Sequence, residues 1–261
     1  MKPNLLITIG DSWTEGTGCY NPIDLSNISI STNFNKFRAS KELFELQKKN
    51  SNRFHENGWP NRLGKKLGFD KVINLSRMGA SNSGLVKLFL EFLEKYNLEN
   101  YNVFVIWMMT EPSRFSFYIN GEIKNFIVNT GEFSNSYYKM LGDEDRDTIL
   151  EQIFYIKTME NICGNNNFNL LITYWSTTAM NLYRIYKSKY YLTPRYQLPI
   201  PLPAPTHIEK NKSSKYYSYI CNHPNELGYE KISNTIASLI EKNHPHYIVN
   251  QSKDDIEWEW L

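Results

Sequence analysis

Residues 5–16 read LLITIGDSWTEG, and the fold of the chain is most readily predicted from this segment. The apolar, β-branched run over residues 5–9 predicts a buried parallel strand close to the N-terminus. The run ends in a Gly-Asp-Ser turn, which would raise one hydroxyl group above the edge of a sheet. Ser12 is therefore the candidate nucleophile, although Gly-Asp-Ser triplets also occur in ordinary turns.

A serine hydroxyl is a poor nucleophile at neutral pH, so Ser12 would need a general base from elsewhere in the chain. Residues 222–229 read NHPNELGY and contain the candidate base, His223. This histidine directly precedes Pro224 at the start of a predicted helix, where an imidazole can face the edge of a sheet. A capping role at the protein surface is the alternative for His223.

Together, the Gly-Asp-Ser turn and the late His-Pro-Asn segment resemble the first and last sequence blocks of the SGNH (GDSL-type) hydrolases. The second block of that family, a glycine after the second strand, corresponds to Gly79 in NLSRMGASN, residues 74–82. The third block is a Gly-x-Asn-Asp motif, and here Thr110 takes the place of the asparagine. The resemblance covers most of the chain, and its first and last blocks are the specific ones.

The resemblance implies a three-layer α/β/α, flavodoxin-like fold (the SGNH hydrolase fold) whose central parallel sheet has about five strands. It also implies a serine esterase that uses Ser12 and His223 and needs no metal and no cofactor. The oxyanion hole would consist of the backbone N–H groups of Ser12 and Gly79 and the side chain of Thr110. The threonine hydroxyl is a single donor on a shorter side chain than asparagine, so capping a helix or turn is the alternative role for Thr110.

The sequence departs from the family pattern at the third member of the catalytic triad. The family has an aspartate three residues before the histidine, whereas this chain has Ile220, and no aspartate lies between Asp147 and Asp254. A backbone carbonyl group or Glu226 would have to orient His223 instead. Loss of the triad carboxylate lowers turnover about 10⁴-fold in other serine hydrolases, which leaves a slow, a specialised or a degenerate site as alternatives.

Two further polar residues are candidates for substrate binding. Arg114 follows the predicted third strand, and a guanidinium group grips carboxylates and phosphates through two hydrogen bonds. An ion pair of Arg114 with Glu111 or Glu15 is the alternative. Asn82 begins a predicted helix and could rebuild the oxyanion hole. Asp11, next to the nucleophile, is expected to be structural, as is usual in the family.

The hydrophobic pattern predicts one α/β domain over residues 1–261. Further buried strands are expected at residues 71–75, 102–107 and 170–175, and helices at 38–49, 59–67, 82–96, 147–164 and 224–242. Apolar residues at helical spacing predict that the last of these helices buries Leu227, Ile232, Ile236, Leu239 and Ile240.

Three segments interrupt this pattern. The first is a lid-like insertion over residues 17–58, at the edge of the sheet where open α/β folds bind ligands. The alternative is that this insertion is a solvent-exposed surface segment that makes no contact with the site. The second is a β-hairpin over 115–133 with its turn at residues 120–121, and the third is a Tyr- and Pro-rich loop over 176–220. The acidic and aromatic tail, 254–261, is expected either to dock through Trp258 and Trp260 or to contact a partner.

The composition restricts the classes of partner. The 29 basic and 27 acidic residues are interspersed and sum to a net charge of +2, so there is no basic stripe of the kind that binds nucleic acid. The three cysteines are odd in number and lack metal-ligand spacing, which predicts free thiols in a reducing compartment. The sequence has no evident signal peptide and no run long enough to cross a membrane, so a cytoplasmic protein is expected. Its Asn- and Lys-rich composition is typical of AT-rich genomes such as those of phages and other viruses.

The leading hypothesis is hydrolysis of an acyl ester. O-acetyl groups of a carbohydrate are the favoured substrate, because the loops are polar and aromatic and contain no continuous lipid-binding stripe. A catalytically weak or inert SGNH-fold binding module, for example on a virus particle, is the second hypothesis. The third is an acyltransferase that excludes water from the acyl-enzyme. The expected partner is thus a small-molecule or carbohydrate ester, and the oligomeric state is left open.

Overall fold

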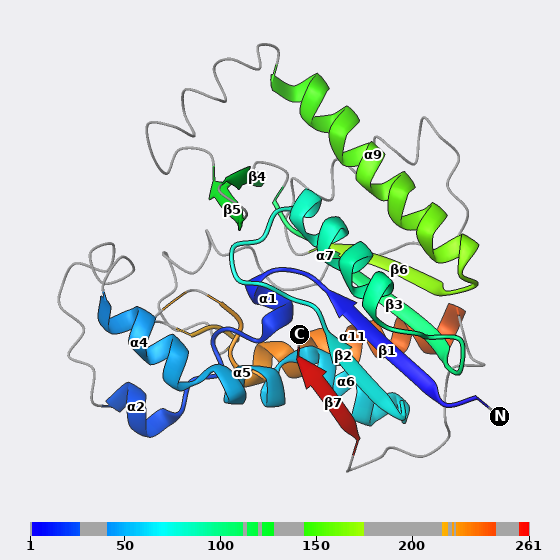
Figure 1. Cartoon of the computed structure of the whole chain (residues 1–261). Helices are drawn as coiled ribbons and strands as arrows, with labels where there is room; N and C mark the ends of the chain where they lie inside the picture. The colour runs from blue at the N-terminus through cyan, green and yellow to red at the C-terminus, as the bar shows by residue number, and fades with distance from the viewer. Residues whose placement is uncertain are drawn as a thin grey trace.

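The centre of the protein is a five-stranded parallel sheet (Figure 1). The computed structural model describes residues 2–26, 41–111, 114–119, 122–127, 144–174, 216–218, 221, 223–243 and 256–260. The strand order is β6-β3-β1-β2-β7, and each strand pairs in parallel with its neighbour. The strands are β1 (Asn4–Ile9), β2 (Lys71–Asn74), β3 (Asn102–Met109), β6 (Asn169–Tyr174) and β7 (Glu257–Trp260). The predicted parallel α/β sheet is confirmed.

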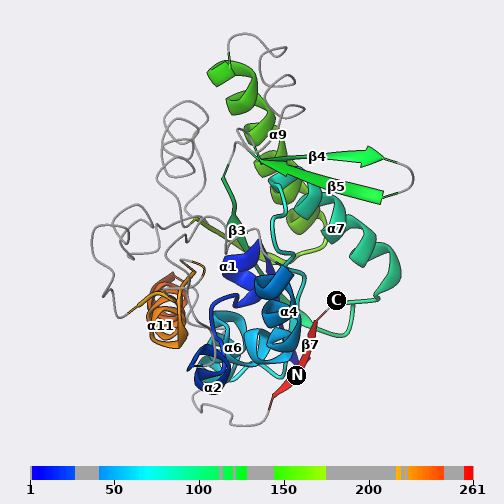
Figure 2. The same cartoon turned by 90° about the vertical axis from the view of Figure 1, so that its left-hand side faces the viewer.

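Helices cover both faces of the sheet. One face packs against α7 (Asn82–Lys95) and α9 (Glu144–Asn165), and the other against α6 (Trp59–Leu67) and α11 (Glu226–Asn243), as Figure 2 shows edge-on. Successive side chains of a strand point to opposite faces, so Leu5 and Ile7 enter the first core and Leu6 the second. Because both faces are covered, the central strands β1 and β3 are largely apolar, and the predicted three-layer α/β/α arrangement is confirmed.

In the described residues before α6, the chain forms four short helices. They are α1 (Ser12–Glu15), α2 (Pro22–Ser26), α4 (Lys41–Lys49) and α5 (Ser51–Asn57). The last three lie in the predicted insertion over 17–58, of which residues 27–40 are outside the described part of the chain. Leu43, Leu46 and Phe54 are buried in the same core as α6 and α11, so this described part of the insertion packs on the domain.

Both strands of the predicted hairpin are present. β4 (Arg114–Ile119) and β5 (Glu122–Ile127) pair in antiparallel fashion, with Ile119 opposite Glu122. β4 contacts α7, and the hairpin lies beside that helix in Figure 2. The expected turn at 120–121, the remainder of the hairpin at 128–133 and all but residues 216–218 of the Tyr- and Pro-rich loop lie outside the described residues.

Several predicted boundaries are wrong. β3 continues to Met109 because its end pairs with Tyr174 of β6. α9 begins at Glu144, before the predicted cap at Asp147 or Thr148, and acidic residues are favourable in the first turn of a helix. In α11, Ile232, Ile236 and Ile240 are buried as predicted, but Leu227 is 52 % exposed. At about 100° per residue, Leu227 is turned about 140° away from Ile232.

The C-terminal tail supplies the fifth strand of the sheet. β7 pairs with β2, from Lys71 opposite Glu257 to Asn74 opposite Trp260. The Lys71 Nζ atom lies 2.5 Å from Glu257 and 3.1 Å from Glu259. Trp258 is 39 % exposed and thus only partly buried. Backbone pairing with β2 and the two ion pairs of Lys71 therefore also contribute to the docking of the tail. No helix in the described ranges combines the length and the apolarity needed to span a bilayer.

Candidate active site

Ser12 is the first residue of α1, the single helical turn that follows β1. The preceding residue, Asp11, caps this turn: its carboxylate accepts a hydrogen bond from the Trp13 N–H group at 3.0 Å. The Asp11 carbonyl oxygen accepts two more, from the N–H groups of Thr14 and Glu15, each at 2.9 Å. The Gly-Asp-Ser segment therefore places the serine at the carboxyl end of the central strand, on a turn whose N-terminus is held by Asp11.

The structure brings Ser12 together with His223. The Ser12 Oγ atom lies 2.7 Å from His223 Nε2, across a separation of 211 residues in sequence. The His223 Nδ1 atom lies 3.0 Å from the carbonyl oxygen of Cys221. A carbonyl oxygen can only accept a hydrogen bond, so this contact puts the imidazole proton on Nδ1 and leaves Nε2 to accept from Ser12.

A short backbone pairing holds the histidine loop. Tyr217 and Pro224 form an antiparallel bridge, and the Ser218 N–H group donates to the His223 carbonyl at 2.8 Å. Asn225 then caps α11 by accepting from the Gly228 N–H group at 3.1 Å. The His-Pro-Asn segment thus ends the bridge and begins the helix, which explains why the histidine is immediately followed by proline and asparagine.

The sequence drew attention to two positions for the orientation of His223: Ile220, which replaces the family's aspartate, and Glu226. Ile220 lies outside the described residues. Glu226 is directed to two arginines: it forms an ion pair with Arg53, and its second oxygen lies 3.8 Å from Arg62. Among the contacts of the described residues, the Cys221 carbonyl is a group at hydrogen-bond distance from His223 Nδ1 that can orient the ring.

Two features of the histidine loop link it to the nucleophile turn. Gly18 has a φ of +121°, and a Cβ atom there would lie 2.2 Å from the Pro224 carbonyl oxygen, so the close approach of the two loops requires glycine. The fully buried Tyr229 donates its hydroxyl to the Thr17 carbonyl at 2.8 Å, and the same hydroxyl oxygen lies 3.4 Å from the backbone carbonyl oxygen of Ser12. Tyr229 closes the His-Pro-Asn-x-x-Gly-Tyr segment, but its sequence context alone does not indicate this role.

Gly79 lies in the loop after β2. Its φ is +73°, and the turn is closed by a 3.0 Å hydrogen bond from Ala80 N–H to the Arg77 carbonyl. The Arg77 N–H group donates to the Gly10 carbonyl at 3.0 Å, which ties the loop to the nucleophile turn. Among the hydrogen bonds of the described residues, none uses the N–H group of Ser12 or of Gly79. The turns after β1 and β2 thus each offer one backbone donor, at Ser12 and Gly79, that no described hydrogen bond uses.

Thr110 and Asn82 bind each other. The Thr110 N–H group donates to Asn82 Oδ1 at 3.0 Å, and Asn82 Nδ2 donates to the Thr110 carbonyl at 3.1 Å and to Gln152 at 2.8 Å. The Thr110 hydroxyl donates to Asp11 Oδ2 at 2.9 Å. Its single hydrogen is thereby committed to Asp11, so in this geometry it does not point to an oxyanion. Both side chains are fully buried, and Asn82, the first residue of α7, links the end of β3 to Gln152 in the interior of α9.

Arg114 forms an ion pair with Asp11, a partner other than the expected Glu111 or Glu15. Its Nη1 atom lies 2.6 Å from Asp11 Oδ2, and the side chains are 13 % and 0 % exposed. The backbone N–H group of Arg114 donates to the Glu111 carbonyl at 3.1 Å.

Glu15, at the end of α1, is a buried carboxyl group close to the dyad. Thr17 donates its hydroxyl to Glu15 Oε2 at 3.1 Å. Burial raises the pKa of Glu15 to about 7, and the Thr17 hydroxyl and the neighbouring His223 partly oppose this rise. The sequence signal, a glutamate three residues after the nucleophile on the same turn, was available but was considered only for an ion pair with Arg114.

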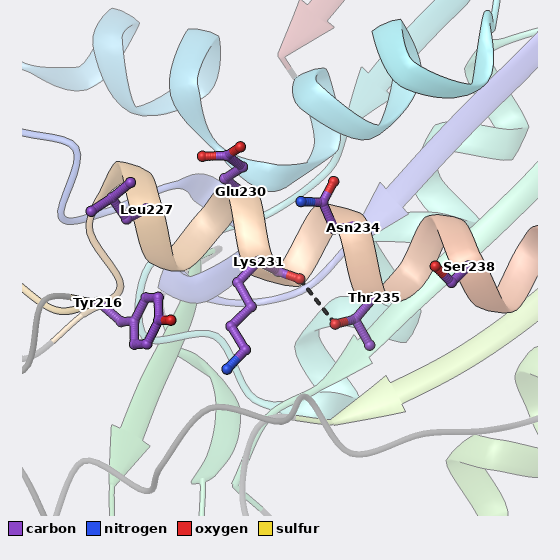
Figure 3. A pocket seen from close by; sticks show the side chains of 7 residues that line it. All are labelled: Tyr216, Leu227, Glu230, Lys231, Asn234, Thr235 and Ser238. Carbon is purple, nitrogen blue, oxygen red and sulfur yellow. Dashed lines mark hydrogen bonds between the residues drawn. The ribbon is translucent and has the colours of Figure 1, made fainter.

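A separate hollow of about 450 Å³ lies on the outer side of α11 (Figure 3). Lys231 extends over the Tyr216 ring, 4.8 Å from its centroid, and the Thr235 hydroxyl donates to the Lys231 carbonyl. Ser12 and His223 are not among the residues that line it, which are Tyr216, Leu227, Glu230, Lys231, Asn234, Thr235 and Ser238.

The candidate site as a whole gathers residues from the carboxyl ends of β1, β2 and β3 and from the loop before α11. Within the described ranges, no three His, Cys, Asp or Glu side chains are grouped so that they could hold a metal ion. No protein-family model matches this sequence, and no curated protein matches it. Its function is therefore inferred from the geometry of the residues themselves.

Proposed function

We propose that this protein is a serine esterase of the SGNH hydrolase type, with Ser12 as nucleophile and His223 as general base. The observation that carries the proposal is the 2.7 Å contact between Ser12 Oγ and His223 Nε2, with Nδ1 held by the Cys221 carbonyl. A nucleophile and a base at hydrogen-bond distance, with the base oriented by a third group, are the arrangement that activates a serine. The contact joins the two segments that carry the family resemblance.

The reaction proceeds in two acyl-transfer steps. His223 takes the Ser12 proton at Nε2 as the serine oxygen attacks the acyl carbon, and the N–H groups of Ser12 and Gly79 stabilise the oxyanion. The tetrahedral intermediate collapses, the alcohol leaves with the proton from His223, and the acyl group stays on Ser12. His223 then removes a proton from water, which attacks the acyl-enzyme, and the proton returns to Ser12 as the acid departs.

The orienting group has a consequence for the rate. A backbone carbonyl holds the imidazole in the correct tautomer, but it carries less negative charge than a carboxylate and stabilises the imidazolium ion less. Replacing the triad aspartate in a serine protease lowers kcat about 10⁴-fold. We therefore expect slow turnover.

O-acetyl groups of carbohydrates are the proposed substrates, because the insertion over residues 17–58 and the loop over 176–220 are polar and aromatic in sequence.

A fluorophosphonate probe, which reacts covalently with activated serines, tests the proposal. The intact protein should be labelled, and peptide mapping should place the label on Ser12. The variants Ser12→Ala and His223→Ala should lose the label. Ser233→Ala, which removes a buried serine from α11, is the matched control and should be labelled like the intact protein.

Hydrolysis assays extend the test to the substrate. The labelled protein should release acetate from an activated aryl acetate and from acetylated sugars, and Ser12→Ala should not. Absence of labelling in a protein shown to be folded would reject the esterase. Such a result would favour a binding module, a second candidate supported by the uncharged orienting group of His223 and by the Thr110 hydroxyl pointing to Asp11.

A further inference from the structure

The Asp11 carboxylate is completely buried and has three hydrogen-bond donors. Oδ1 accepts from the Trp13 N–H group at 3.0 Å, whereas Oδ2 accepts from the Thr110 hydroxyl at 2.9 Å and from Arg114 Nη1 at 2.6 Å. The first two donors are neutral, so Arg114 brings the positive charge. A buried carboxylate is tolerated when it is paired and hydrogen-bonded, and removal of the charged partner leaves an uncompensated charge.

The position of Asp11 determines the position of Ser12. α1 is one turn long, and its N–H groups at Trp13, Thr14 and Glu15 all donate to the Asp11 side chain or carbonyl. So short a helix has little stability of its own, because its intrahelical hydrogen bonds are few. If the Asp11 carboxylate moved toward water, the Ser12 hydroxyl and N–H group would move with it.

We propose that Arg114 is a positioning residue for Ser12, acting through Asp11. In this role, which rests on the proposed esterase function, Arg114 neutralises the Asp11 carboxylate and so fixes the turn that presents Ser12 to His223. The positive charge of Arg114 is then neutralised by Asp11 inside the protein, so the substrate does not need to carry a negative charge. Because Arg114 is the first residue of β4, the hairpin is anchored to the nucleophile turn.

The alternative role for Arg114 is that of an anchor for a substrate anion. The two roles differ in their kinetic signature. Removing a substrate anchor raises KM with little change in kcat, whereas misplacing a nucleophile lowers kcat with little change in KM. Misplacement of reacting groups by about 1 Å costs about 10²-fold in rate.

The test compares Arg114→Met with Arg114→Lys and with the double variant Asp11→Asn/Arg114→Met. Arg114→Met should slow fluorophosphonate labelling and lower kcat on an aryl acetate by about 10- to 100-fold, with KM within about twofold. Arg114→Lys should recover part of the rate because it restores the charge. The double variant should be faster than Arg114→Met, since it removes the buried charge together with its partner.

Lys71→Met is the matched control. Lys71 is 17 % exposed in its side chain, comparable with 13 % for Arg114, and its ion pairs with Glu257 and Glu259 lie at the amino end of β2, away from the site. It should lower stability without changing the labelling rate of the folded protein. Hydrogen exchange of the peptide that contains residues 11–16 adds a measurement that needs no activity: exchange should accelerate in Arg114→Met and not in Lys71→Met.

The outcomes separate the two proposals. An unchanged labelling rate and unchanged exchange in Arg114→Met would overturn the positioning role, as would a raised KM at constant kcat or an equal loss of rate in Lys71→Met. Labelling of Ser12→Ala, or no labelling of the intact protein, would instead overturn the esterase. Faster exchange of residues 11–16 in Arg114→Met would still support the link between Arg114 and the Ser12 turn in that case.

Discussion

Substitution of Glu15 by glutamine tests the electrostatics of the candidate site without reference to activity. The side chain is 9 % exposed, and burial raises its pKa from 4.5 to about 7. In the unfolded chain Glu15 releases its proton near pH 4.5, whereas in the folded protein it keeps the proton until about pH 7. Folding therefore takes up a proton between these pH values, and the stability that the protonated group contributes is lost as pH rises through this window.

The magnitude follows from the pKa difference. At about 1.4 kcal/mol per pH unit, ionisation of Glu15 lowers the free energy of unfolding by about 3 kcal/mol between pH 4 and pH 8. Glutamine has nearly the same shape and still accepts the Thr17 hydroxyl, but it has no charge to bury. The free energy of unfolding of Glu15→Gln, relative to the intact protein, should therefore rise by up to that amount over this pH range.

Urea denaturation of both proteins at pH 5, 6, 7 and 8 measures this difference in the free energy of unfolding. The contributions of the other titrating groups cancel because both proteins share them. Glu94→Gln, which removes an exposed carboxylate from α7, is the control and should give a difference that changes little with pH. If the Glu15→Gln difference stays constant from pH 5 to pH 8, burial does not raise the pKa of Glu15 and the reasoning is refuted.

Two further substitutions test how the loops are held together. Gly18→Ala places a Cβ atom 2.2 Å from the Pro224 carbonyl at a φ of +121°, so it should destabilise the protein by about 1–3 kcal/mol and slow fluorophosphonate labelling. Gly164→Ala has space for its methyl group and should do neither, so equal effects of the two substitutions on denaturation and labelling would contradict the prediction. Tyr229→Phe removes the hydroxyl that donates to the Thr17 carbonyl at 2.8 Å and should lower the free energy of unfolding by about 1–3 kcal/mol, and an unchanged urea midpoint would show that this bond contributes nothing.

The main elements of the sheet could be predicted because burial on both faces leaves a continuous apolar run in the sequence. β1 and β3 are such runs, and α7 is marked by the cap at Ser81 and by its apolar spacing. β7 could not be predicted as a strand. Its sequence, EWEW, alternates charge and tryptophan, and it becomes a strand because the edge of β2 offers unpaired backbone groups and Lys71 attracts its glutamates.

The roles of the polar residues around the nucleophile depended on partners far away in sequence. Asp11 meets Thr110 and Arg114, which are 99 and 103 residues further along the chain. A threonine or an arginine after a strand has the same local sequence whether it faces a substrate or a buried carboxylate. Only the folded arrangement distinguishes an oxyanion donor from a group that holds the nucleophile turn.

The sequence by itself determined the parallel α/β sheet and the two segments that carry Ser12 and His223, because periodicity and turn chemistry are local properties. The tertiary structure decided what surrounds that pair. The group that orients His223 is the Cys221 backbone carbonyl, and every residue has a carbonyl, so no side-chain pattern identifies it. The charge state of Glu15 likewise follows from burial by the assembled fold, which residues 12–15 alone do not specify.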